Sequence, residues 1–124
     1  MITTSNSKIK GVSVCVPDNH ITNKSKLSFK EKDQFINLTG VKKHYLDEKK
    51  NFKTSDLCLH AAEKIIKNLK WKKSEISFLI FVSQSRDYVF PSTSCILQKR
   101  LKLNKNILTL DIPFGCSGYV YGLY

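Results

Sequence analysis

Cysteine is the residue type in this chain best suited to covalent chemistry, and there are four, at Cys15, Cys58, Cys95 and Cys116. A metal site needs several such ligands at short, fixed spacings. These four lie far apart in the sequence, with no Cys-x-x-Cys pair and no His at a ligand interval. We therefore predict no bound metal, and the question becomes whether one of the cysteines acts as a nucleophile.

Cys116 has the local sequence of a nucleophile. It lies between Gly115 and the pair Ser117-Gly118, after a predicted strand and at the start of a predicted helix. At such a junction the unpaired backbone N–H groups and the positive end of the helix dipole favour a thiolate. The glycines permit a tight turn and a close approach of substrate. A buried, inert cysteine would also fit this pattern, so the residues alone leave both interpretations open.

The elements that would position Cys116 alternate between strand and helix. Apolar periodicity predicts strands at 9–16, 76–83 and 106–112, the last two buried on both faces of a sheet. Helical spacing and start signals predict helices at 24–38, 54–69 and 91–101, and another after Gly115. Residues 41–52 are predicted to form a short strand and a loop. Because strands joined by crossover helices run parallel, we predict a single α/β domain over residues 1–124.

Three other side chains that could take part in chemistry are predicted to have structural roles or to lie at the surface. Cys58 falls on the apolar stripe of the helix 54–69 and is predicted to lie in the core. His60 falls on the opposite side of that helix, which predicts a solvated surface histidine. Cys95 is predicted on the packing face of the helix 91–101. None of the three is therefore a catalytic candidate.

The net charge of +11, from 21 basic and 10 acidic residues, admits a second class of function. A basic face attracts nucleic acid, anionic membranes or phosphorylated partners, so a non-catalytic basic binding module is an alternative. Its binding to nucleic acid would weaken steeply with salt. However, only Arg86 and Arg100 are arginines, whereas base-specific contacts rely heavily on arginine. A general bias of the sequence towards Lys, Ile and Asn is the simpler explanation.

The sequence also bears on the compartment. The first ten residues are polar, which is unlike a secretory signal. The longest uncharged stretch, 112–124, is shorter than the ~18 residues that suggest a membrane span. We therefore expect a cytoplasmic protein with free thiols and no membrane span.

Several segments together resemble one enzyme family. The segment DIPFGCSGYVYGL at 111–123 resembles the active-site segment of 3-oxoacyl-[acyl-carrier-protein] synthase III, a condensing enzyme of the thiolase superfamily. Four more agree in order and spacing: GVSVCVPDNHITN at 11–23, TGVKKHYL at 39–46, TSDLCLHAAEKII at 54–66 and DYVFPSTSCILQKRL at 87–101. The resemblance covers nearly the whole chain and implies the N-terminal half of a thiolase-like α/β fold.

The resemblance implies a reaction and its participants. Cys116 would take an acyl group from a coenzyme A thioester and yield it to the carbanion formed when malonyl-acyl carrier protein loses CO₂, giving a 3-oxoacyl-carrier protein. Backbone N–H groups around Cys116 could form an oxyanion hole. The partners implied are the acyl carrier protein and an acyl thioester as substrates, with no separate cofactor. Phe90 matches the aromatic that family members place in the neighbouring subunit's acyl pocket, which implies a homodimer; without the family, core packing before Pro91 explains it equally well.

Two departures from the family limit what the resemblance implies. The Trp and Arg that clasp the adenine of coenzyme A correspond here to Gln34 and Leu38, so we expect another thioester donor or a differently built entrance. The family's catalytic His and Asn lie in its second half, and His20, His44 and His60 match neither. The apolar ending at 119–124 is typical of a truncated chain. We therefore expect the 124 residues alone to be inactive; an inactive product of a shortened gene is a further alternative.

Overall fold

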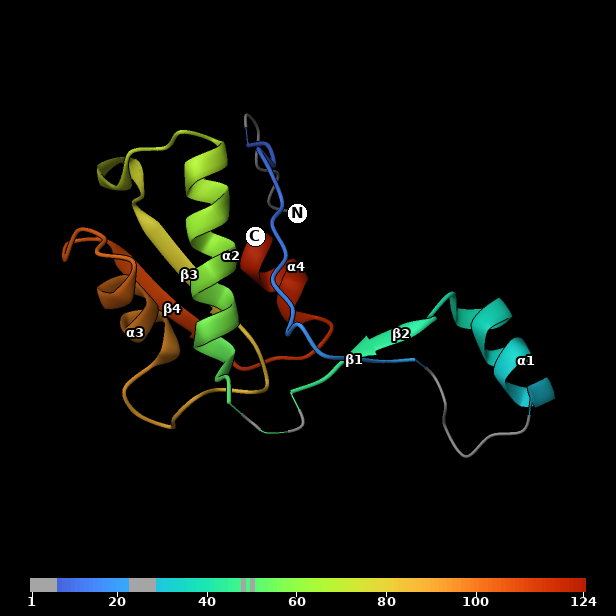
Figure 1. Cartoon of the computed structure of the whole chain (residues 1–124). Coiled ribbons are helices and arrows are strands. Elements are labelled where there is room, and N and C mark those ends of the chain that lie inside the picture. Colours follow the sequence, from blue (N-terminus) through green and yellow to red (C-terminus); the bar gives the residue numbers. More distant parts are fainter. Residues whose placement is uncertain (1–6, 23–28, 48, 50) are drawn as a thin grey trace. The chain divides into compact units, whose positions relative to one another are not determined.

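The computed structural model describes residues 7–22, 29–47, 49 and 51–124 (Figure 1). It groups the chain into two compact units, one made of Met1–Cys15 with Lys53–Tyr124 and the other of Val16–Phe52. The elements, in order, are β1 (His20–Thr22), α1 (Phe29–Thr39), β2 (Lys43–Tyr45), α2 (Thr54–Asn68), a 3₁₀ turn (Lys73–Glu75), β3 (Phe78–Val82), α3 (Thr93–Arg100), β4 (Leu108–Ile112) and α4 (Gly118–Leu123).

The first unit is built on a parallel pair of strands. β3 and β4 pair in parallel from Phe78 with Leu108 to Val82 with Ile112. Both are short and mostly apolar, and each contains two β-branched residues, which suits extended backbone in a sheet. α3 connects the end of β3 to the start of β4, as a parallel pair requires. The predicted α/β pattern of strand, helix, strand and helix around Cys116 is confirmed.

The core of this unit lies between the sheet and two helices. Its buried apolar side chains come from β3, from α3 and from the turn that follows α3: Phe81, Leu97, Leu101 and Leu103. The apolar stripe of α2 packs against this cluster, with Cys58, Leu59, Ala62 and Ile66 partly buried. The predicted helix at 54–69 and the structural role of Cys58 are therefore confirmed.

The opposite face of the sheet is more open than the sequence predicts. Successive side chains of a strand point to opposite faces, and Leu79 and Phe81 of β3 point towards the core. On the other face, Phe78 is 47% exposed and Leu110 is also 47% exposed. Among the described residues, α4 lies against part of this face, beside Val82, Ile80 and Ile112. The prediction that both strands are buried on both faces is therefore wrong.

The N-terminal segment of this unit also differs from its prediction. Residues 9–16 are extended but form no strand, because none of the described strands pairs with their backbone. Val12 is 82% exposed and Val14 68%. Gly11 instead lies against α2, where a Cβ placed on it would lie 3.5 Å from side-chain atoms of both Ile65 and Leu69. The valines alternate as in a strand, but none of the described strands pairs with this segment.

The second unit contains α1 and an antiparallel pair, in which β1 and β2 align His20 with Tyr45. β2 confirms the short strand expected within 41–52, whereas β1 was not predicted. The start of the helix predicted at 24–38 lies partly outside the described residues. Its end is confirmed, since α1 stops at Thr39 and Gly40 takes a left-handed φ of 70°. Thr39 Oγ1 donates to the Phe35 carbonyl over 2.7 Å and accepts from the Val41 N–H.

Candidate active site

Cys116 lies exposed in the turn between β4 and α4. β4 ends at Ile112, and Pro113, which has no N–H, follows at once. The Gly118 N–H donates to the Gly115 carbonyl over 2.9 Å and closes a tight turn around Cys116. The predicted order of strand, cysteine and helix is therefore confirmed.

Gly118 allows α4 to begin directly against the sheet. It is buried, and a Cβ placed on it would lie 2.6 Å from Val82 Cγ1 and 3.1 Å from Phe114 Cβ. Carbon atoms in ordinary contact are about 3.5–4.0 Å apart, so no residue with a side chain fits without movement. The close approach of α4 to the end of β3 fixes the turn that carries Cys116.

Asp111 attaches the same end of β4 to α3. Its two carboxylate oxygens accept from the Thr93 N–H over 2.7 Å and from the Ser94 N–H over 2.8 Å. These are first-turn N–H groups of α3 that have no partner within the helix. Thr93 and Ser94 are fully buried, so the carboxylate replaces water as their acceptor. The strand end that precedes Cys116 is thereby fixed to the helix beside it.

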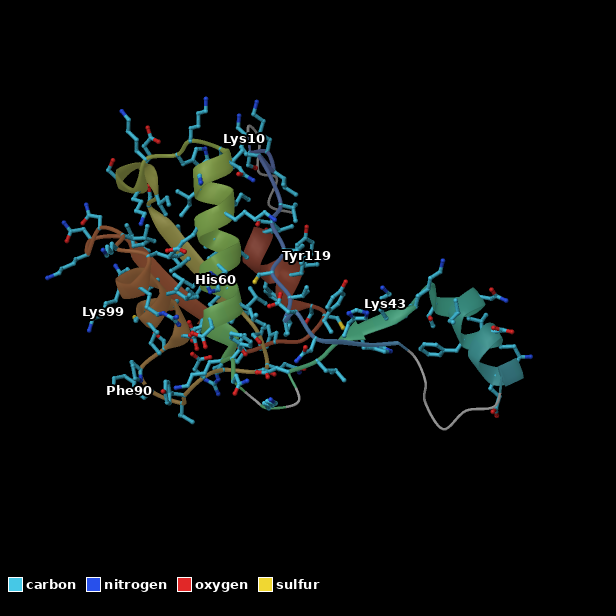
Figure 2. All side chains as sticks on the ribbon, in the orientation of Figure 1. Lys10, Lys43, His60, Phe90, Lys99 and Tyr119 are labelled. Carbon is cyan, nitrogen blue, oxygen red and sulfur yellow. The ribbon has the colours of Figure 1, made fainter. Side chains whose placement is uncertain are left out.

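A cavity of about 630 Å³ opens beside Cys116. Its lining residues come from the ends of β3 and β4, the turns that follow them, and α4: Ile80, Val82, Ser83, Gln84, Ser85, Phe114, Gly115, Cys116, Tyr119, Gly122 and Leu123. Most of the wall is apolar, and the polar groups lie where the two strands end. Figure 2 shows Tyr119 on α4, in the part of the unit that carries this cavity. The thiol therefore has open space beside it.

Phe90 lies in the loop between β3 and α3 and is 88% exposed (Figure 2). This exposure is incompatible with core packing before Pro91, the alternative explanation of this residue. Instead, the preceding part of the loop is held: Asp87 Oδ1 accepts from the Ser55 N–H at the start of α2 over 3.1 Å. Lys53 donates to the hydroxyl of Tyr88. An exposed aromatic on an anchored loop is available for contact with another surface.

Arg100, at the end of α3, also contacts the start of α2. It donates to Ser55 Oγ over 2.8 Å and forms an ion pair with Asp56 at 2.7 Å. Asp56 also accepts from the Lys53 N–H over 2.7 Å. The hydrogen bond from Lys53 N–H, followed by that from Arg100, lowers the pKa of Asp56 from its ordinary value of 3.8. α2 thus begins after Lys53, and Asp56 caps it from the third position.

Comparisons with known proteins agree with this geometry. No family model matches the chain. It is 34% identical over 120 residues to a beta-ketoacyl-[acyl-carrier-protein] synthase III of Fusobacterium nucleatum, covering 93% of this chain and 35% of the relative. It is 32% identical over 120 residues to the synthase III of Clostridium perfringens strain 13, covering 95% of this chain and 36% of the relative. A solved 3-oxoacyl-(acyl-carrier protein) synthase from Burkholderia xenovorans superposes with a TM-score of 0.77 at 32% identity, over 90% of this chain and 34% of that one.

This chain is homologous to 3-oxoacyl-[acyl-carrier-protein] synthase III. Its fold is that of part of the thiolase-like condensing enzymes, as the family resemblance implied. The chain spans about a third of the length of the relatives it matches, rather than the half that the sequence led us to expect.

Two of the other cysteines of this chain, Cys58 and Cys95, have shifted pKa values. Burial raises the pKa of the half-buried Cys58. Cys95 is exposed, so its predicted place on a packing face is wrong. Its position near the start of a short helix directs it along the edge of β4, where its Sγ lies 3.3 Å from Thr109 Oγ1. Hydrogen bonds from Ser92 and then Thr109 lower the pKa of this thiol.

Among the residues that the structure describes, no histidine lines the Cys116 cavity. His60 is exposed on α2, as predicted (Figure 2), and His20 and His44 belong to the second unit. Within the described residues, no three His, Cys, Asp or Glu side chains gather as metal ligands. The helices of the same described part include none long and apolar enough to cross a membrane.

Gln84 is a cavity residue that sequence reasoning missed. It follows β3 as Cys116 follows β4, and the carboxyl ends of neighbouring parallel strands meet at one edge of a sheet. The sequence therefore contained a signal for Gln84. Once the two strands are predicted to be parallel, the residues just after each strand are expected to lie in one site. Asp111 also went unnoticed, because an acidic residue inside an apolar strand is informative only when its partners are known.

Proposed function

We propose that this chain carries the nucleophilic cysteine of a 3-oxoacyl-[acyl-carrier-protein] synthase III. The observation that supports it most strongly is the exposed Cys116 beside the 630 Å³ cavity, on the turn after β4, in a chain homologous to synthases of that name. A thiol in the turn between a strand and a helix, with open space beside it, is suited to nucleophilic acyl transfer.

In the first half of the proposed reaction, the Cys116 thiol loses its proton to solvent and the thiolate attacks the carbonyl carbon of an acyl thioester. A carbon–sulfur bond to Cys116 forms, the bond to the donor thiol breaks, and that thiolate takes a proton from solvent. In the second half, malonyl-acyl carrier protein loses CO₂ and the resulting carbanion attacks the acyl-Cys116 carbonyl. The new carbon–carbon bond gives 3-oxoacyl-acyl carrier protein and frees the Cys116 thiolate.

Of the described residues, those that line the cavity supply the nucleophile and the space but include neither His nor Asn. The family resemblance predicts one of each for decarboxylation, so complete condensation needs groups beyond these lining residues. Acyl transfer to Cys116 is thus the half-reaction that the described site is equipped for.

The partners follow from the same proposal. The substrates are an acyl thioester, of coenzyme A or another carrier, and malonyl-acyl carrier protein, with no separate cofactor. Phe90 is proposed to enter the acyl pocket of a second copy in a homodimer, which its exposure permits. The cytoplasmic location expected from the sequence stays a prediction, to be tested by cell fractionation.

The test is a condensation assay with radiolabelled malonyl-acyl carrier protein and a panel of acyl thioesters, using the protein at its native length. We expect labelled 3-oxoacyl product with the unsubstituted protein and none with Cys116→Ala. Product formation that survives Cys116→Ala would overturn the proposal. If neither protein forms product but both bind nucleic acid in a salt-dependent manner, the basic binding module is the better explanation; if they do neither, the chain is inactive.

A further inference from the structure

Gln84 is the one side chain with a carboxamide among the described residues that line the Cys116 cavity. A carboxamide offers two N–H donors and a carbonyl acceptor and stays neutral at every working pH. Most of the surrounding wall is apolar, including Ile80, Val82 and Phe114. Gln84 is exposed, so its carboxamide can reach a ligand that enters the cavity from solvent.

The carboxamide lies directly against the backbone next to the nucleophile. A Cβ placed on Gly115 would lie 3.2 Å from Gln84 Nε2, 3.3 Å from its Cδ and 3.4 Å from its Oε1. All three atoms of the amide therefore face the residue that precedes Cys116. Gly115 accommodates this contact because it has no side chain.

The backbone around Gln84 is also held in place. The Ser83 N–H donates to the Ile112 carbonyl over 3.2 Å, which extends the pairing of β3 and β4 by one step. The Ser83 hydroxyl accepts from the Ser85 N–H over 2.9 Å and so closes a turn with Gln84 at its centre. Ser83 is thus occupied in the turn, whereas no described group bonds the Gln84 amide, which stays available to a ligand in the cavity.

We propose that Gln84 binds the carbonyl oxygen of the acyl thioester that reacts with Cys116, by donating a hydrogen bond from its carboxamide. This inference rests on the proposed function and adds the residue that orients its substrate. Gln84 makes and breaks no covalent bond. Its hydrogen bond strengthens as the carbonyl oxygen gains negative charge during attack by sulfur, so it favours the transition state over the bound substrate.

The test compares two reactions of Cys116 in the protein at its native length. The first is acylation by acetyl-coenzyme A and acetyl-acyl carrier protein, followed by intact-protein mass spectrometry. The second is modification by methyl methanethiosulfonate, which has no carbonyl oxygen and so reports only the reactivity and access of the thiol. The variants are Gln84→Ala, Gln84→Glu, which keeps the shape but loses the donors when ionised, and Asn68→Ala, which removes an exposed carboxamide at the end of α2.

We expect acylation to slow by about 10- to 100-fold in both Gln84 variants. Methanethiosulfonate modification should stay within about threefold of the unsubstituted protein, as should both reactions of Asn68→Ala. Unchanged acylation in the Gln84 variants would overturn this inference and leave the proposed function intact. Equal slowing of both reactions would also overturn it, because Gln84 would then only support the turn. Absence of acylation at Cys116 in the unsubstituted protein would overturn the proposed function and this inference with it.

Discussion

Gly118→Ala should damage the candidate site by pushing α4 away from the sheet. The added Cβ would lie 2.6 Å from Val82 Cγ1, and restoring ordinary contact needs a movement of roughly 1 Å. Overpacking of this kind costs about 1–3 kcal/mol. Alanine recovers up to about 1 kcal/mol of helix propensity over glycine. We therefore expect a net loss of about 1 kcal/mol in the free energy of unfolding.

The same movement should displace Cys116, which lies two residues before Gly118. Misplacement of a reacting group by about 1 Å can slow a reaction by ~100-fold. We expect acylation of Cys116 to slow by at least about 10-fold, far more than the loss of stability would produce through unfolded protein alone.

A double-mutant cycle with Val82→Ala tests the cause. That variant alone removes two partly buried methyl groups and should cost about 1.6 kcal/mol. In the double variant the new methyl occupies the vacated space, so the combined cost should fall short of the sum by about 1 kcal/mol. Urea unfolding measures the free energies. Gly122→Ala is the matched control, because its Cβ would lie 3.0 Å from Val82 Cγ2 and demands less movement.

Additive costs in this cycle, or a Gly118→Ala variant as stable and as reactive as the unsubstituted protein, would refute the reasoning. The contact between α4 and β3 would then not fix the turn that carries Cys116.

Three other substitutions follow from the geometry. Asp111→Ala removes the acceptor of two buried N–H groups of α3. It should lower the free energy of unfolding, measured with urea, by about 2–4 kcal/mol, and Asp111→Asn should lower it by less. Equal stability of the unsubstituted protein and both variants would contradict this. Asp56→Asn should cost about 1 kcal/mol. Because the folded pKa of Asp56 is depressed below 3.8, this stabilisation is complete above about pH 5 and is lost as the pH falls through the folded value. A deficit of Asp56→Asn that does not shrink as the pH is lowered from 5 would contradict this. Phe90→Ala should change stability by less than about 0.5 kcal/mol, since the side chain is 88% exposed, while shifting the preference among acyl chain lengths; an unchanged preference would count against its place in an acyl pocket.

The sequence predicted those features of the fold that depend on local pattern. The helix at Thr54–Asn68 has a strong apolar stripe and start signals, and the short, mostly apolar runs at 78–82 and 108–112, with two β-branched residues each, favour strands. Their parallel pairing followed from the helix between them. These elements were enough to place Cys116 at the entry to α4.

Features that depend on partners distant in the sequence could not be predicted. The valines at 12, 14 and 16 alternate as in a strand, but whether a strand forms depends on a neighbour that the local pattern does not reveal. Cys95 and the outer face of the sheet were assigned from apolarity alone, although exposure depends on what packs against them. The pairing of Arg100 with Asp56, and the contact of Gln84 with Gly115, join residues that only the fold brings together.

The central claim is that Cys116 is the residue that receives an acyl group. The most direct measurement is to incubate the protein with a ¹³C-labelled acetyl thioester, digest it, and locate the added acetyl group by mass spectrometry of the four cysteine peptides. We predict a thioester adduct on the peptide containing Cys116, which disappears in Cys116→Ala and stays in Cys95→Ala. An adduct on the exposed Cys95, or none on Cys116 while the fold is intact, would contradict the account.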